Sequence, residues 1–93
     1  MDHKERYAAL RPAIRRVLME KWDPLAVSDL AEAAHEYDNY IPGLYSLLAG
    51  EAPDEQIVAH LRKIETEWMG LGAQEQERLQ TVVGALRQAF GAD

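Results

Sequence analysis

Residues 22–40 read WDPLAVSDLAEAAHEYDNY, and this stretch divides the helical pattern of the chain. It holds Trp22, a helix-start signal at Asp23-Pro24, and the tyrosines Tyr37 and Tyr40. An aspartate at an N-cap accepts hydrogen bonds from unpaired backbone N–H groups, and a proline at the first helical position loses no hydrogen bond. The stretch therefore predicts that one helix ends near Trp22 and that another starts soon after it.

A second start signal follows at Asp29 and Glu32, whose spacing resembles an acidic capping box. Three alanines between residues 31 and 34 favour helix. We therefore predict a short helix from about residue 29 to residue 37, with residues 25–28 as the connection that leads into it.

Before this stretch, apolar residues recur at intervals of three and four and predict a helix over residues 3–21. Pro12 falls inside that helix, where its ring removes a backbone donor and clashes with the preceding turn. We therefore expect a break or a kink at Pro12. The apolar stripe consists of Leu10, Ile14, Val17, Leu18 and Trp22.

After the stretch, glycines and prolines mark the ends of three further helices. They are expected from about Tyr40 to Ala49, from about Ala52 to Gly70, and from about Ala73 to Phe90. No segment alternates as a strand does. We therefore predict an all-α fold, a small antiparallel bundle of four to five helices that forms one domain over residues 1–93. The predicted inward-facing residues are Tyr37, Ile41, Leu44, Leu48, Ile57, Leu61, Ile64, Trp68, Leu79, Val82, Val83, Leu86 and Phe90.

The large aromatic residues leave one question open. Trp22 and Trp68 each lie at a helix end on an apolar stripe, and we expect both to close the core. Tyr37 and Tyr40 are either core residues whose hydroxyls reach a partner such as Asp23, or exposed aromatic residues set among carboxylates. In the second case they suit a hot spot for protein binding.

The formal net charge of −6 is unevenly distributed. Residues 1–21 carry six basic and three acidic side chains, and residues 22–61 carry eight acidic side chains and no basic ones. An acidic middle repels DNA, whose binders gather Lys and Arg on one face. It suits a basic protein partner, although negative charge also serves solubility in general. The basic patch of Arg11, Arg15 and Arg16 is expected to be solvated or paired with the acidic middle.

Motifs that carry enzymatic chemistry are missing from the sequence. His35-Glu36 resembles the start of a HExxH zinc helix, but the residue four positions after His35 is Asn39. Glu32 and His35 form a single Glu-x-x-His pair, whereas a di-metal bundle needs such pairs from facing helices. There is no cysteine, no Gly-rich phosphate loop, and neither serine stands in a nucleophile motif. We therefore predict that the protein is not an enzyme and has no catalytic residue, metal or cofactor.

No signal for membrane or export is visible in the sequence. The first residues, MDHKERYAALRP, contain no apolar signal segment, and no apolar run approaches the ~20 residues of a membrane span. We expect a cytoplasmic protein that binds neither membrane nor nucleic acid.

The motifs WDPLAV (22–27), EYDNY (36–40) and IETEWMGL (64–71) resemble, in this order, a family of small bacterial helical proteins. That family has no assigned function, and its pattern is WDPxxV, then EYDxY, then a helix that ends in MGL. The resemblance covers about residues 14–71 and implies an all-α fold without known catalysis. Some similar small acidic proteins look like immunity proteins encoded beside secreted toxins. The matching positions are Trp22, Asp23, Pro24, Val27, Glu36, Tyr37, Asp38 and Tyr40.

These observations favour a non-enzymatic protein that blocks a basic partner, for example a toxin, in the manner of an immunity protein or antitoxin. The alternative is a structural protein that self-associates as a homodimer, and a metal-dependent enzyme is a distant third. The predicted partner-binding residues are Asp29, Glu32, Glu36, Tyr37, Asp38 and Tyr40. The predicted structural motif consists of Trp22, Asp23, Pro24, Val27 and Trp68.

Overall fold

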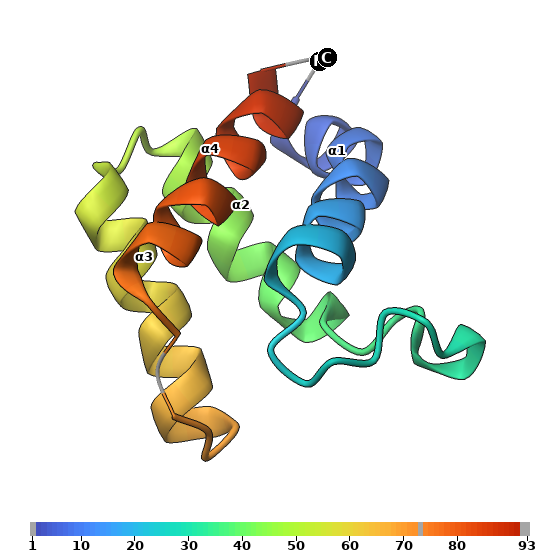
Figure 1. Ribbon diagram of the computed structural model, residues 1–93. Helices are drawn as coiled ribbons and strands as arrows, with labels where there is room; N and C mark the ends of the chain where they lie inside the picture. The colour runs from blue at the N-terminus through green and yellow to red at the C-terminus, as the bar shows by residue number, and fades with distance from the viewer. Residues whose placement is uncertain (1, 73, 92–93) are drawn as a thin grey trace.

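The computed structural model describes residues 2–72 and 74–91, and this part of the chain consists of helices and turns without a strand (Figure 1). Its four α-helices are α1 (His3–Val17), α2 (Ile41–Ala49), α3 (Asp54–Lys63) and α4 (Gln76–Gly91). The prediction of a compact all-α fold is confirmed. The predicted start of the last helix at Ala73 lies outside the described residues.

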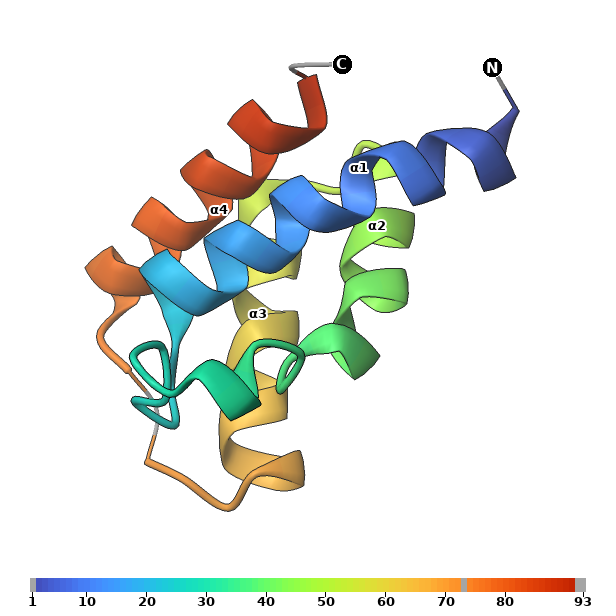
Figure 2. The same ribbon diagram turned by 90° about the vertical axis from the view of Figure 1, so that its right-hand side faces the viewer.

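Helices α1 and α4 form the most extensive helix pair, and Figure 2 shows them running antiparallel. Helix α3 packs against α4, and α2 packs against α1, so that each helix contributes a face to one core. The radius of gyration is 12.6 Å, which is typical of a compact chain of this length. No helix in the described ranges is long and apolar enough to cross a membrane.

The predicted apolar stripes supply most of the core. Val17 and Phe90 are half-buried at its margin, and Tyr45 and Val58 join it although they were not predicted to be buried. The fully or almost fully buried apolar residues are Leu10, Ile14, Leu18, Trp22, Tyr37, Ile41, Leu44, Tyr45, Leu48, Ile57, Val58, Leu61, Ile64, Leu79, Val82, Val83 and Leu86.

Helix α1 passes through Pro12 without a break, so the expected break is not observed. Proline at this position removes the hydrogen bond to the carbonyl of Ala8, one turn earlier. Both Pro12 and Ala8 are exposed, so water can hydrate that carbonyl. The face with Leu10 and Ile14 stays buried and holds the helix together.

Helices α1 and α3 each end in a π-helical turn, η1 (Leu18–Trp22) and η4 (Ile64–Trp68). The N–H groups of Asp23 and Met69 donate to carbonyls five residues back, at 2.8 and 2.9 Å. Such turns are rare and widen the helix by one residue. Each of the two turns has tryptophan as its last residue.

The prediction that Trp68 is buried is wrong. Trp68 is 55% exposed, whereas Met69 packs against the core. Trp22, at the end of η1, is fully buried as predicted.

The helix predicted over residues 29–37 is also wrong. That region contains the short 3₁₀ segment η2 (Ala31–Ala33), and a second one, η3 (Asp38–Tyr40), leads into α2. No residue from 28 to 36 is buried. Short helices are marginal in water without tertiary packing, so the start signal and the alanines do not suffice.

Candidate functional site

Asp23 organises the turn that follows η1 instead of capping a helix. It adopts the left-handed conformation, with φ of 33° and ψ of 58°. Its Oδ1 accepts a hydrogen bond from the Val27 N–H at 2.9 Å, and its Oδ2 accepts one from the Ser28 N–H at 3.1 Å. Pro24 follows in the turn, and Val27 packs against the edge of the core. The carboxylate therefore satisfies backbone donors as predicted, but they belong to a turn.

Tyr37 completes this joint from the other end of the loop. It is 1% exposed, and its ring centroid lies 5.3 Å from that of Trp22. Its hydroxyl donates to Asp23 Oδ1 at 2.7 Å and accepts from the Leu25 N–H at 3.0 Å. The structure therefore shows the first of the two alternatives for Tyr37, a core residue whose hydroxyl reaches Asp23. A partner has no access to its ring.

The joint shifts the pKa of both of its ionisable members. Burial and the hydrogen bond to Asp23 raise the pKa of Tyr37 above its ordinary value. Burial would by itself raise the pKa of Asp23, but the hydrogen bonds from Tyr37, Val27 and Ser28 together lower it. The pair is therefore a neutral phenol that donates to an ionised carboxylate at neutral pH.

Glu65 forms a second buried junction, which the sequence analysis did not single out. It is fully buried, and its Oε2 accepts from Trp22 Nε1 at 2.9 Å and from the Gln74 side-chain amide at 2.7 Å. The Gln74 backbone N–H is 3.3 Å from Oε1. Glu65 follows the buried Leu61 by four residues, so the helical spacing of α3 could have predicted that this glutamate faces the core. The junction joins the two π-helical turns.

Asp38 ties the end of the loop to α1. Arg15 donates from Nε to Oδ1 and from Nη2 to Oδ2, each at 2.8 Å. Arg11 and His35 lie 3.5 and 2.9 Å from the same carboxylate. The hydrogen bonds from Arg15 are the largest of the influences that lower the pKa of Asp38 to about 2. The expected pairing between the basic patch and the acidic middle is therefore present, and Asp38 already has internal partners.

The Asp38 clamp is expected to make stability depend on pH in the acid range. Because the pKa is about 2 when folded and about 3.9 when unfolded, its stabilisation is complete above pH ~5 and is lost as pH falls to about 2 and below. The full contribution is about 2–3 kcal/mol. Urea unfolding at steps between pH 2 and 5 should show a steeper loss for the wild type than for Asp38→Asn.

Asp23 also has a lowered pKa, so a smaller slope should remain in the Asp38→Asn variant. The difference between the two proteins is the quantity to measure. Equal slopes for wild type and variant would show that the clamp is not present in solution.

Three of the predicted partner-binding residues, Asp29, Glu32 and Glu36, are exposed. None of the three has a basic partner among the described residues. They lie on the irregular segment between the Asp23 joint and the Asp38 clamp, which fix its two ends. The segment is thus an acidic surface held at both ends, and we call residues 29–36 the acidic segment.

An aromatic surface lies where η3 meets η4. The rings of Tyr40 and Trp68 stack with centroids 6.1 Å apart and an interplanar angle of 17°. Tyr40 also meets Trp22 edge-on, and His60 meets Trp68 edge-on at 5.9 Å. Tyr40 is half-buried, so the exposed ring of this cluster is Trp68, which the sequence analysis had assigned to the core. Burial first and the charge of Lys63 second lower the pKa of His60.

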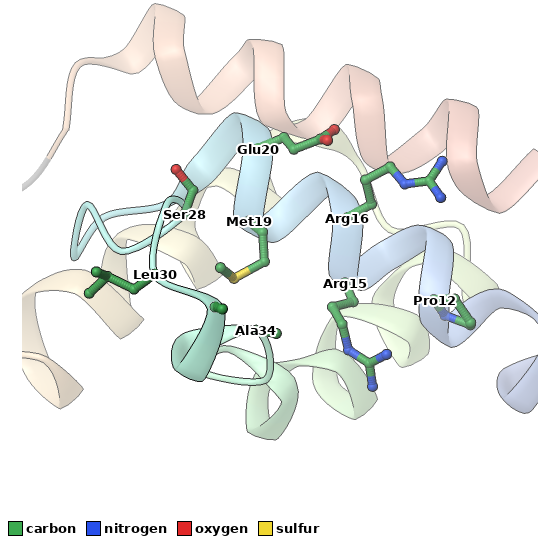
Figure 3. Close-up of a pocket in the computed structure, with 9 residues that line it drawn as sticks. Pro12, Arg15, Arg16, Met19, Glu20, Ser28, Leu30 and Ala34 are labelled. Carbon is green, nitrogen blue, oxygen red and sulfur yellow. The ribbon is translucent and has the colours of Figure 1, made fainter.

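A groove of about 390 Å³ runs between α1–η1 and the acidic segment (Figure 3). Met19 comes from η1 and Leu30 from the acidic segment, while Arg15 and Arg16 project from α1 in different directions. The wall opposite α1 carries the small side chains of the segment. The lining residues are Pro12, Arg15, Arg16, Met19, Glu20, Ser28, Leu30, Ala31 and Ala34.

The described residues contain no group of three or more His, Cys, Asp or Glu side chains placed to hold a metal ion. Comparison of the chain with protein-family models, with curated proteins and with solved structures finds no match.

Proposed function

We propose that this protein is a non-enzymatic acidic binding module that blocks a basic partner protein, most concretely as an immunity protein or antitoxin. One observation carries the proposal: the carboxylates of Asp29, Glu32 and Glu36 are exposed and lack a basic partner in the described part of the chain. Carboxylates without internal partners attract Lys and Arg from a second protein and accelerate its association.

The Trp68–Tyr40 stack supports the same proposal. Hot spots are enriched in Trp and Tyr, and an exposed tryptophan held by a stacked tyrosine offers a large, rigid contact. Glu67, which directly precedes Trp68 in the sequence, is also exposed. A carboxylate therefore accompanies the exposed tryptophan. We therefore assign the anchor role to Tyr40 and Trp68. Tyr37 is buried, and its hydrogen bond to Asp23 fixes the ends of the loop that carries the acidic segment.

Asp38 belongs to the support of the surface and not to its contacts. Its carboxylate is held by Arg15, so a partner would have to break an existing ion pair to reach it. Because both ends of the acidic segment are already fixed, ordering the segment on binding costs little conformational entropy.

Charge reversal of the acidic segment is expected to abolish capture of the partner without unfolding the protein. The variant is Asp29→Lys, Glu32→Lys and Glu36→Lys, with Asp38 left intact to preserve the clamp. Tagged wild-type protein should retain one basic protein from its own cell lysate at low salt, and less of it at moderate salt because screening weakens surface charge. The reversal variant should retain none.

The matched control changes net charge equally but elsewhere, with Glu51→Lys, Glu55→Lys and Glu75→Lys, all at exposed positions. Far-UV circular dichroism of both variants tests that they remain folded. Capture that survives the reversal of the acidic segment, or that both triple variants lose equally, would exclude this surface as the binding site.

A further inference from the structure

We propose that His60 is a proton-sensitive support of the Trp68–Tyr40 stack, and that its protonation frees Trp68 from the stack and weakens the hold of this anchor on a basic partner. The inference concerns the regulation of the anchor, and for the partner it rests on the proposed function. The change in the anchor itself involves this chain alone and is tested without a partner.

His60 differs from the other two histidines in lacking a polar partner. His3 Nδ1 lies 3.4 Å from the Tyr45 hydroxyl, and His35 Nδ1 lies 2.9 Å from the Asp38 carboxylate. His60 makes neither a hydrogen bond nor an ion pair with a residue of the described ranges. It is half-buried, so water reaches only part of its ring. A second proton on this ring therefore has no acceptor within the described part of the protein.

Two elements pack against the ring of His60. From η4, Trp68 meets it edge-on, with ring centroids 5.9 Å apart and an interplanar angle of 88°. From α2, Gly43 lies so close that a β-carbon added to it would come within 3.2 Å of His60 Nε2. This ring nitrogen thus faces the backbone of α2, where no acceptor is present for an N–H group.

The surroundings of His60 favour its neutral form. Burial first and the charge of Lys63 second lower its pKa. Lys63 lies on the same helix, whereas Gly43 of α2 has no charge and Glu67 of η4 forms no ion pair with His60. The titratable group of η3 in this cluster is the phenol of Tyr40. His60 is therefore uncharged at neutral pH, and its protonation below pH ~6.5 opposes the folded contact.

Protonation is expected to move the ring out of this contact. An imidazolium has two N–H groups that need acceptors or water, and the ring finds them only away from Gly43. Trp68 has two ring neighbours in the described part of the chain, Tyr40 and His60, so it loses one of its two supports. The new charge joins that of Lys63 and repels the Lys and Arg side chains of a basic partner.

Nuclear magnetic resonance of the full chain between about pH 8 and pH 4.5, a range that brackets histidine titration, is the first test. Asp38 stays ionised over this range, because its pKa is about 2. The His60 ring should titrate with a midpoint below its ordinary value of about 6.5. Nuclear Overhauser contacts between the rings of Trp68 and Tyr40 should disappear with the same midpoint.

Three variants and one internal reference make this test specific. His60→Gln should make the contacts of the stack independent of pH, because glutamine does not titrate. Lys63→Gln removes a like charge and should raise the midpoint of His60. His35→Gln is the matched control at a histidine outside the cluster and should leave the transition unchanged. The ring contacts between Trp22 and Tyr37 are the reference and should persist throughout.

Two results would overturn the proposal. A His60 midpoint at or above ~6.5 would show that Trp68 stabilises the cation, as in a cation–π contact. Ring contacts between Trp68 and Tyr40 that persist once His60 is protonated would show that His60 does not control the stack.

Capture of the basic protein from the lysate is the second test. Protein bound to wild type near neutral pH should be released by a wash at about pH 5, below the ordinary histidine value, and His60→Gln should retain it. Equal release from both proteins would overturn the regulation of the partner by His60. Empty capture near neutral pH would contradict the proposed function, whereas the resonance test would still decide the role of His60 in the stack.

Discussion

Replacing Trp22 with alanine is expected to lower the free energy of unfolding by about 3–5 kcal/mol. Trp22 is fully buried, contacts Tyr37 and Tyr40, and donates its indole N–H to the buried carboxylate of Glu65. Alanine would leave a large cavity and remove one hydrogen-bond donor from that carboxylate. A domain of this length has about 5–14 kcal/mol of stability in total, so the variant should be close to unfolding. Urea unfolding followed by far-UV circular dichroism measures the loss.

Two companion variants separate the cavity from the hydrogen bond. Trp22→Phe keeps most of the ring but not the N–H, and should lose about 1–3 kcal/mol because the buried Glu65 loses one of its hydrogen-bond donors. Trp68→Ala removes the exposed tryptophan and should lose only about 0.5–1.5 kcal/mol, the value of its stack on Tyr40. If Trp22→Ala were no less stable than Trp68→Ala, the burial of Trp22 described above would be incorrect.

Replacing Asp23 with alanine is expected to lower the free energy of unfolding by about 2–4 kcal/mol. The turn N–H groups of Val27 and Ser28, left without their acceptor, account for about 1 kcal/mol, and the buried Tyr37 hydroxyl left without its acceptor accounts for about 1–3 kcal/mol. Alanine is also strained at the left-handed conformation of this residue, where φ is 33°. Equilibrium unfolding in urea at neutral pH gives the value.

The coupling between Asp23 and Tyr37 can be measured directly in a double-mutant cycle. Asp23→Ala, Tyr37→Phe and the double variant should show that the second substitution is less harmful once the first is present, since they share one hydrogen bond. Asp23→Asn should be mild because asparagine tolerates the left-handed conformation and keeps a carbonyl acceptor. Strict additivity of the two single losses would contradict the joint.

The amino-acid sequence determined the helical class, the position of α2 and of α3 together with η4 to within a few residues, the end of α4, and most of the core. Residues three and four apart in a helix share a face whatever the rest of the chain does, so a periodic apolar stripe is readable locally. The clearest cases are the stripes of α2 and α4, where nearly every predicted inward residue is buried.

The tertiary structure alone decided the joints and the surface. Trp22 reaches Glu65 across 43 positions, Arg15 reaches Asp38 across 23, and Tyr37 reaches Asp23 across 14. These contacts bury Tyr37, and they fix the two ends of the acidic segment although the segment forms no α-helix. Trp68, at the end of η4, is exposed, although Trp22 at the end of η1 is buried. Such outcomes depend on which distant groups meet, and short-range periodicity carries no information about that.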